Sequence, residues 1–192
     1  MTAATTPLGL VIFGVVMAAF MMQEFTRGFG TPADGEVRDD RSALIYLEVL
    51  PVVLVIAAFG VSLGGWLAWP SSWPVLVVGL VFMLAGLGVR EWSHRTLGPF
   101  HRALVTIQGD HELVTGGPYR FVRHPMYAGS ALTFLGIGLV LGTVPALVVA
   151  FVGTLHAMIR RIQVEERALE GALGERYREY AASRPRLVPG LW

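Results

Sequence analysis

The chain has 192 residues, of which 54% are hydrophobic and only 15% are charged, and its formal net charge is +1. A soluble domain carries about 25% charged residues, so this composition excludes an ordinary soluble domain and indicates an all-α integral membrane protein. A net charge near zero gives no basis for nucleic-acid binding. The absence of cysteine excludes disulfides, thiol catalysis and cysteine metal sites.

Five apolar segments are predicted to cross the bilayer as helices. They lie at residues 8–25, 43–69, 75–89, 125–141 and 146–159. Pro51 is expected to kink the second segment or to mark its true start.

The connections between these segments differ in character. Residues 26–42 form a polar loop, and residues 90–125 form a long amphiphilic connection. The segments at 70–74 and 142–145 are short turns with proline. Residues 160–182 are predicted to continue the fifth segment as a charged amphipathic helix, and the last ten residues are predicted to be extended.

The basic residues are distributed on one side of this topology. All 15 are arginines, and all lie in the first loop, in the third loop (Arg90 included) or in the C-terminal tail. Loops rich in arginine stay in the cytoplasm, so we predict a multi-pass inner-membrane protein with the N-terminus outside and the C-terminus cytoplasmic.

Two polar clusters lie on the predicted cytoplasmic side. The first is HELVTGGPYRFVRHPMYAG at residues 111–129, and the second is RRIQVEER at residues 160–167. The two helices between them are joined by about four residues, so they must be antiparallel neighbours and must bring the clusters together. Glu165 and Glu166 point about 100° apart on a helix, so we expect them to have different partners.

The residue types in these clusters limit the ligand. Carboxylates suit an ammonium, sugar hydroxyls or an adenine amino group, whereas arginines suit a carboxylate or a phosphate. Gly116 and Gly117 allow a close approach of the backbone. An amino-acid-bearing nucleoside uses all of these groups, but the composition alone does not identify one.

Each singled-out residue also has a structural interpretation. Glu165 and Glu166 could form salt bridges along one solvated helix with Arg161 and Arg167. His156 lies inside an apolar segment, where a buried packing role is favoured, and Gly86 and Gly88 are typical of helix packing. A metal site from His111, His124 and the glutamates is not predicted, because no tight ligand spacing occurs.

Three motifs together resemble a known group of enzymes. Residues 123–127 read R-H-P-M-Y, residues 161–166 read R-I-Q-V-E-E, and Gly174, Tyr177 and Tyr180 follow a G-x-x-Y-x-x-Y pattern. This order resembles the isoprenylcysteine carboxyl methyltransferase and phospholipid methyltransferase group of integral membrane enzymes. The resemblance extends over residues 86–190.

The resemblance implies S-adenosyl-L-methionine as the cofactor, bound at the cytoplasmic membrane face without a Rossmann domain. The residues that it places around the cofactor are His111, Leu113, Gly117, Tyr119, His124, Tyr127, Glu165 and Glu166. The catalytic residues that it implies are Arg123, Arg161 and Glu165, with the arginines orienting cofactor or substrate.

The resemblance also implies a lipophilic acceptor, an isoprenoid carboxylate or a lipid, that enters from the bilayer, and no obligate protein partner is evident. Carboxyl O-methylation is favoured over N-methylation. Residues 86–192 are expected to form the methyltransferase core, and residues 1–85 to form a scaffold that shapes the lipid entrance. The alternative is a non-catalytic membrane protein that binds a lipid or a nucleoside.

Overall fold

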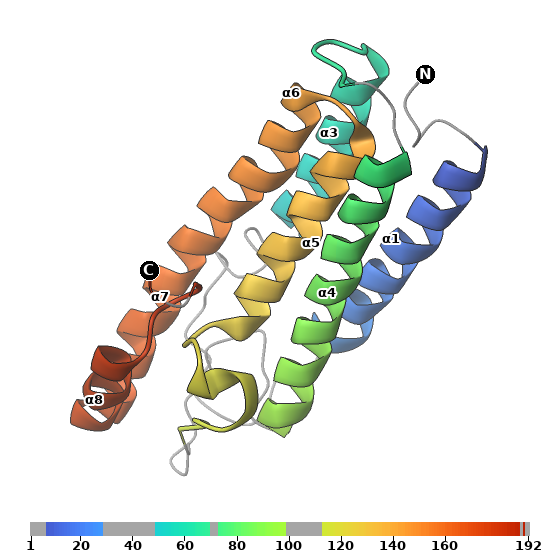
Figure 1. Ribbon diagram of the computed structural model, residues 1–192. Helices are drawn as coiled ribbons and strands as arrows, with labels where there is room; N and C mark the ends of the chain where they lie inside the picture. Colours follow the sequence, from blue (N-terminus) through green and yellow to red (C-terminus); the bar gives the residue numbers. More distant parts are fainter. Residues whose placement is uncertain (1–6, 29–48, 70–72, 99–112, 189, 191–192) are drawn as a thin grey trace.

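The computed structural model describes the chain except for residues 1–6, 29–48, 70–72, 99–112, 189 and 191–192. Every regular element within the described residues is a helix, and one isolated β-bridge joins Ala68 to Thr143. The prediction of an all-helical fold is therefore confirmed for the described part of the chain (Figure 1).

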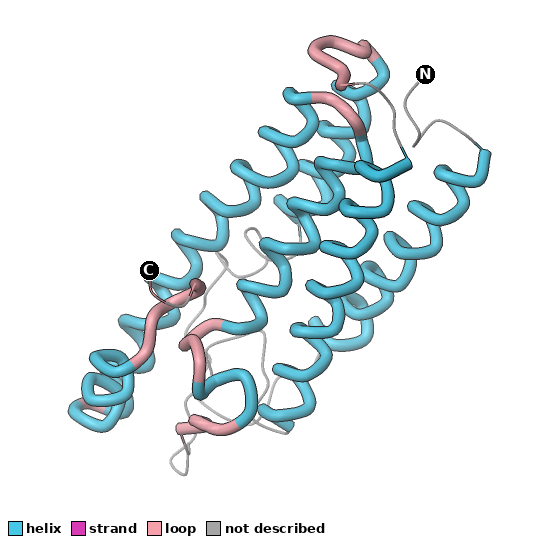
Figure 2. Tube along the Cα trace, viewed as in Figure 1, coloured by secondary structure: helices cyan, strands magenta, loops and turns pink. Residues whose placement is uncertain are grey.

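The long helices lie side by side and alternate in direction (Figure 1). They are α1 (Pro7–Gly28), α3 (Leu50–Leu63), α4 (Trp73–Leu97), α5 (Pro125–Leu141) and a continuous run made of α6 (Val144–Leu147), the π-helical η5 (Val148–Gly153) and α7 (Thr154–Leu173). The short elements are the 3-10 helix η4 (Gly117–Arg120) and α8 (Glu175–Ser183). Figure 2 shows that loops join these helices at the two ends of the bundle.

Two of the described helices, Trp73–Leu97 and Val144–Leu173, are long and apolar enough to cross a membrane. The shorter apolar helices are Phe13–Gln23, Leu50–Leu63 and Pro125–Leu141. The apolar character of the predicted segments is thus present in the structure, whereas the number of spans stays a prediction.

The predicted boundaries are right for α5 and wrong for three other helices. α5 starts at Pro125, whose ring fits the first turn of a helix, and ends before Gly142 in the left-handed conformation. The second segment was expected to reach residue 69, but α3 ends at Leu63, where Gly64 and the left-handed Gly65 follow. Residues 43–48 of that segment lie outside the described residues.

The third predicted segment ended at residue 89, but α4 continues to Leu97. A charged residue ends an apolar segment but not a helix, because arginine itself favours helix. The side chain of Arg90 is buried and donates a hydrogen bond to the hydroxyl of Ser130 on α5. The predicted helix at 160–182 is also interrupted: α7 ends at Leu173, and Gly174 has φ 55° and ψ −126°, so α8 leaves in a new direction.

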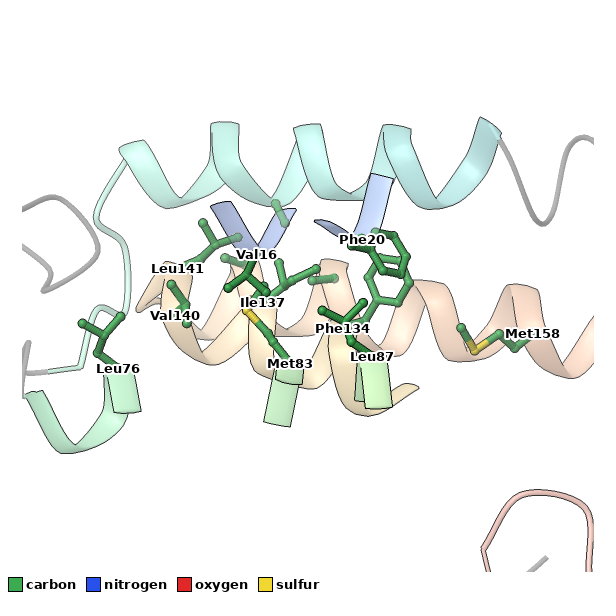
Figure 3. Packing of buried hydrophobic residues seen from close by; sticks show 13 residues of the cluster. Val16, Phe20, Leu76, Met83, Leu87, Phe134, Ile137, Val140, Leu141 and Met158 are labelled. Carbon is green, nitrogen blue, oxygen red and sulfur yellow. The ribbon is translucent and has the colours of Figure 1, made fainter. Parts of the chain in front are cut away.

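The core lies between α4 and α5 and extends to α1, to α3 and to the continuous run of α6, η5 and α7. Met83 and Leu87 of α4 pack beside Phe134 and Ile137 of α5 (Figure 3). Phe20 of α1 meets Phe134 edge to face, with ring centroids 5.4 Å apart. Lipid tails are as apolar as these side chains, so in a bilayer this contact is stabilised by close packing more than by removal from water.

Glycines bring α4 and α5 into close contact. A Cβ added to Gly129 would lie 2.7 Å from the carbonyl oxygen of Gly86, and one added to Gly79 would lie 3.0 Å from that of Gly136. The packing interpretation of Gly86 is confirmed, whereas Gly88 is exposed with open space around it. Small residues of this kind let membrane helices approach closely and fix their register.

We predict that Gly129→Ala destabilises the protein by about 1–3 kcal/mol, because the new methyl group has no room against α4. The matched control Gly88→Ala should be neutral or slightly stabilising, since alanine favours helix and the site is open. Thermal unfolding in detergent measures both variants. Equal melting temperatures for the two would contradict this account of the α4–α5 interface.

Candidate functional site

The polar residues converge at the end of the bundle where α5 begins. His124 immediately precedes α5, and Pro125 takes a first-turn position of that helix. α7 runs past this point, so its charged half lies beside the start of α5, below the centre of the bundle in Figure 1. The prediction that the two polar clusters meet is confirmed by direct contacts between Tyr127 and Glu165 and between His124 and Glu166.

Glu166 is the most heavily bonded residue of the site. Its Oε1 lies 2.8 Å from Nη1 of Arg123 and 3.2 Å from Nε2 of His124, and its Oε2 accepts from Nε of Arg186 at 2.9 Å. The carboxylate is buried, so it needs such partners to offset the loss of hydration. We call Arg123, His124, Tyr127, Glu165 and Glu166 the carboxylate cluster.

Glu165 has a different environment from its neighbour. Its Oε2 accepts a hydrogen bond of 2.8 Å from the hydroxyl of Tyr127, and its Oε1 lies 4.0 Å from Nδ1 of His124. The side chain of Glu165 is 29% exposed, compared with 11% for Glu166. The expectation of different partners is confirmed, and Glu165 is the more exposed of the two carboxylates.

Three phenols surround the carboxylate cluster. Burial and the nearby negative charge of Glu165 raise the pKa of Tyr119 well above its ordinary range, so its hydroxyl stays protonated. Burial also raises the pKa of Tyr177, and it raises that of Tyr180 to about 12. The hydroxyl of Tyr180 donates to the carbonyl oxygen of Tyr119 at 2.8 Å, which fastens α8 to η4.

The other residues predicted for the site differ in their burial and in their neighbours. Arg161 is only 2% exposed, and it contributes to the electrostatic environment of Tyr127. Gly117 has φ +55° and lies against Thr96 of α4, where an added Cβ would be 2.9 Å from a methyl group. Leu113 is half-buried, and His111 lies outside the described residues.

The structure contradicts the structural interpretations of Glu166 and of His156. Glu166 does not pair along its own helix: its partners Arg123 and Arg186 come from other segments, and Nε of Arg167 donates to the carbonyl oxygen of Gln163. His156 is exposed on α7 and is not buried in the packing. Both errors arise because periodicity gives the spacing of a helix but not the segment that covers each face.

Sequence reasoning did not find Arg186. It lies in a proline-rich tail without periodic pattern, and nothing in that tail indicates a partner twenty positions upstream. Thr96 was likewise missed as the residue against which Gly117 packs. The only sequence signal for the tail was its proline content, which predicts an extended backbone but not where it lies.

Comparison with known proteins decides the family. The model of the phospholipid methyltransferase family matches residues 74–176, more than half of the chain. The chain belongs to the phospholipid methyltransferase family. The solved structure of the eukaryotic intramembrane Ras methyltransferase ICMT (isoprenylcysteine carboxyl methyltransferase) has the same fold, with a TM-score of 0.68 at 19% identity, covering 97% of this chain and 69% of that one.

Curated proteins similar to this chain are named for different activities. A probable protein-S-isoprenylcysteine O-methyltransferase of Oryza sativa subsp. indica is 35% identical over 57% of this chain and 58% of the relative. The cobalt-zinc-cadmium resistance protein CzcN of Cupriavidus metallidurans is 34% identical over 77% and 63%. A methanethiol S-methyltransferase of Crocosphaera subtropica is 39% identical over 37% and 27%. The chain thus spans less than two thirds of the length of these relatives.

We predict that the two glutamates differ in their structural importance. Glu166→Gln should cost about 3–5 kcal/mol of stability, because it removes the charge on which Arg123 and Arg186 converge. Glu165→Gln, the matched control on the adjacent position, should change stability by less than about 1 kcal/mol because its side chain is partly exposed. Chemical or thermal unfolding in detergent measures the stability of both variants. An equal loss of stability in both would contradict the distinct environments of Glu165 and Glu166.

Proposed function

We propose that this protein is an S-adenosyl-L-methionine-dependent methyltransferase that acts on a lipophilic acceptor at the cytoplasmic face of the membrane. Membership of the phospholipid methyltransferase family supports methyl transfer. The single observation that carries the proposal is the carboxylate cluster, in which Glu165 keeps an accessible carboxylate beside buried cationic side chains.

The residues present suit this cofactor chemically. An amino-acid-bearing nucleoside offers an ammonium and hydroxyls to carboxylates, and a carboxylate to arginines. Glu165 supplies a partly accessible acceptor, and the protonated hydroxyl of Tyr119 supplies a donor. The side chain of Arg123, which is 12% exposed, adds a cation beside the neighbouring carboxylate of Glu166.

The protein has a limited task in such a reaction. The cofactor supplies an electrophilic methyl group on a sulfonium, so the main requirement is alignment of the acceptor with it, for which effective molarities of about 10⁵–10⁸ M are possible. Arg123 and Arg161 would orient an anionic acceptor. For an amine acceptor, Glu165 or His124 would take the proton. The contact of Nε2 of His124 with Glu166 would then determine which ring nitrogen of His124 is free to accept it.

The position of the cluster at one end of the bundle supports access from the membrane. We infer five spans with the arginine-rich loops in the cytoplasm, so that an acceptor can reach the cluster from the bilayer with its head group at the interface. In this arrangement residues 86–192 form the methyltransferase core. Residues 1–85 shape the entrance, and Phe20 of α1, which lies under Arg90 at 5.2 Å, joins the two parts.

The charge of the site favours one class of acceptor. Two arginines, Arg123 and Arg161, lie in or next to the carboxylate cluster, which favours a carboxylate and therefore O-methylation. The similarity to a methanethiol S-methyltransferase favours a thiol as the second candidate.

Methyl transfer can be tested together with the acceptor class. Purified protein is incubated in vesicles with methyl-labelled S-adenosylmethionine and membrane lipid extract, isoprenoid carboxylates or lipophilic thiols, and product is treated with base. Base releases labelled methanol from a methyl ester but not from a thioether or a methylated amine. We expect base-labile label, and loss of at least about 100-fold in rate for Glu165→Gln, the scale of one positioned catalytic group.

A base-stable product would show that the acceptor is a thiol or an amine and not a carboxylate. Absence of label transfer to every acceptor class, from folded protein that still binds S-adenosylhomocysteine, would favour the non-catalytic alternative. If the folded protein neither transfers label nor binds S-adenosylhomocysteine, then S-adenosyl-L-methionine is not its cofactor.

A further inference from the structure

The C-terminal tail returns across the candidate site. Residues 184–188, which we call the C-terminal strap, run between α7 and the segment before α5 (Figure 2). The backbone N–H of Arg123 donates to the carbonyl oxygen of Pro185 at 2.9 Å, and that of His124 donates to the carbonyl oxygen of Arg186 at 3.0 Å. Two consecutive residues of the carboxylate cluster are therefore held by the strap through their main chain.

The side chain of Arg186 adds a second attachment. Nε and Nη2 both lie 2.9 Å from Oε2 of Glu166. The other oxygen, Oε1, is taken by Arg123 and His124. The strap thus contacts both the backbone that carries the two cationic residues and the carboxylate toward which they point.

These bonds constrain the geometry of the site. A buried N–H needs an acceptor, and the strap provides one for each of the two residues that precede α5. The buried side chain of Leu187, which is 6% exposed, anchors the strap next to Arg186. The strap thus holds the backbone from which the side chains of Arg123 and His124 reach Glu166.

The strap also determines which glutamate remains for a ligand. Oε2 of Glu166 is neutralised by Arg186, so Glu166 is committed to holding the cluster together. Glu165 keeps its bond with Tyr127 and a partly exposed carboxylate. The ion pair of Glu166 with Arg186, which lies outside the helical hairpin, therefore distinguishes Glu166 from Glu165.

We propose that Arg186 is a positioning residue: through Glu166 and the strap backbone it holds Arg123 and His124 in the orientation that the cofactor site requires. The strap lies beyond residue 176, where the match to the family model ends. The ligand part of this inference rests on the proposed function, whereas the assembly of the carboxylate cluster by the strap does not.

The test uses Arg186→Gln, Arg186→Lys and, as a matched control, Arg184→Gln, in the full chain in detergent. Arg184 is an arginine of the same strap whose Nη1 donates to the adjacent carbonyl of Ser183. The first measurement is hydrogen exchange, by mass spectrometry, of a peptide that contains Arg123 and His124 in ligand-free protein. The second is the Kd for S-adenosylhomocysteine.

Arg186→Gln should accelerate exchange at these amides and raise the Kd, each by about tenfold or more, the scale of a lost charged hydrogen bond. Arg186→Lys, which keeps the charge, should restore part of both. For Arg184→Gln, the exchange rate and the Kd should both stay within about twofold of the values for the unchanged protein. In a Glu166→Gln background, Arg186→Gln should have little further effect, because the two act through one interaction.

The outcomes separate the two proposals. Equal exchange and equal Kd for the Gln variants at 184 and 186 would overturn the positioning role. Failure of the unchanged protein to bind S-adenosylhomocysteine would overturn the proposed function, and the exchange data would still decide whether the strap holds the cluster. Accelerated exchange without any change in Kd would limit the strap to structure and overturn its role toward the cofactor.

Discussion

The organisation of the site depends on one buried carboxylate. Glu166 binds Arg123 and His124, which precede α5, and Arg186, which lies in the tail. A carboxylate removed from water is tolerated only when its partners are close and well placed. Because Glu166 and its partners belong to three separate parts of the chain, this one charge joins the start of α5, the charged half of α7 and the C-terminal strap at the same place.

The helical bundle provides the frame on which that interaction is built. Glycines at the α4–α5 contact set a close separation, and the short turn after α5 returns the chain as an antiparallel neighbour. The turn thereby places the two polar segments at the same end of the bundle, where Glu166 contacts Arg123 and His124. Tyr180, by donating to the carbonyl of Tyr119, adds α8 to the same end.

Part of this arrangement follows from local rules that the sequence makes visible. Proline at the start and glycine after the end of α5 predict its limits, and the short turn predicts the meeting of His124 with Glu166. The end of α4 was missed because the apolar segment ends at Arg90, whereas the helix does not, since arginine favours helix. No local pattern indicates its tertiary partner, Ser130. The break at Gly174 was missed for a related reason, since glycine is compatible with both a continuing and an ending helix.

The tail shows the limit of sequence reasoning most clearly. Proline predicts an extended backbone, but the partner of Arg186 is determined by where α8 directs the chain. The distinction between Glu165 and Glu166 depends on this same partner. Periodicity places the two glutamates on different faces, and only the three-dimensional contacts show which of them is the more exposed.

The central claim is that the carboxylate cluster faces the bound cofactor, and direct photolabelling tests it. Irradiation of the protein with methyl-labelled S-adenosylmethionine, followed by proteolysis and peptide identification, locates the contact without requiring knowledge of the acceptor. The account predicts label in the peptides that contain residues 117–127 and 161–166, and its displacement by excess S-adenosylhomocysteine. Displaceable label confined to α1 or α3 would contradict it.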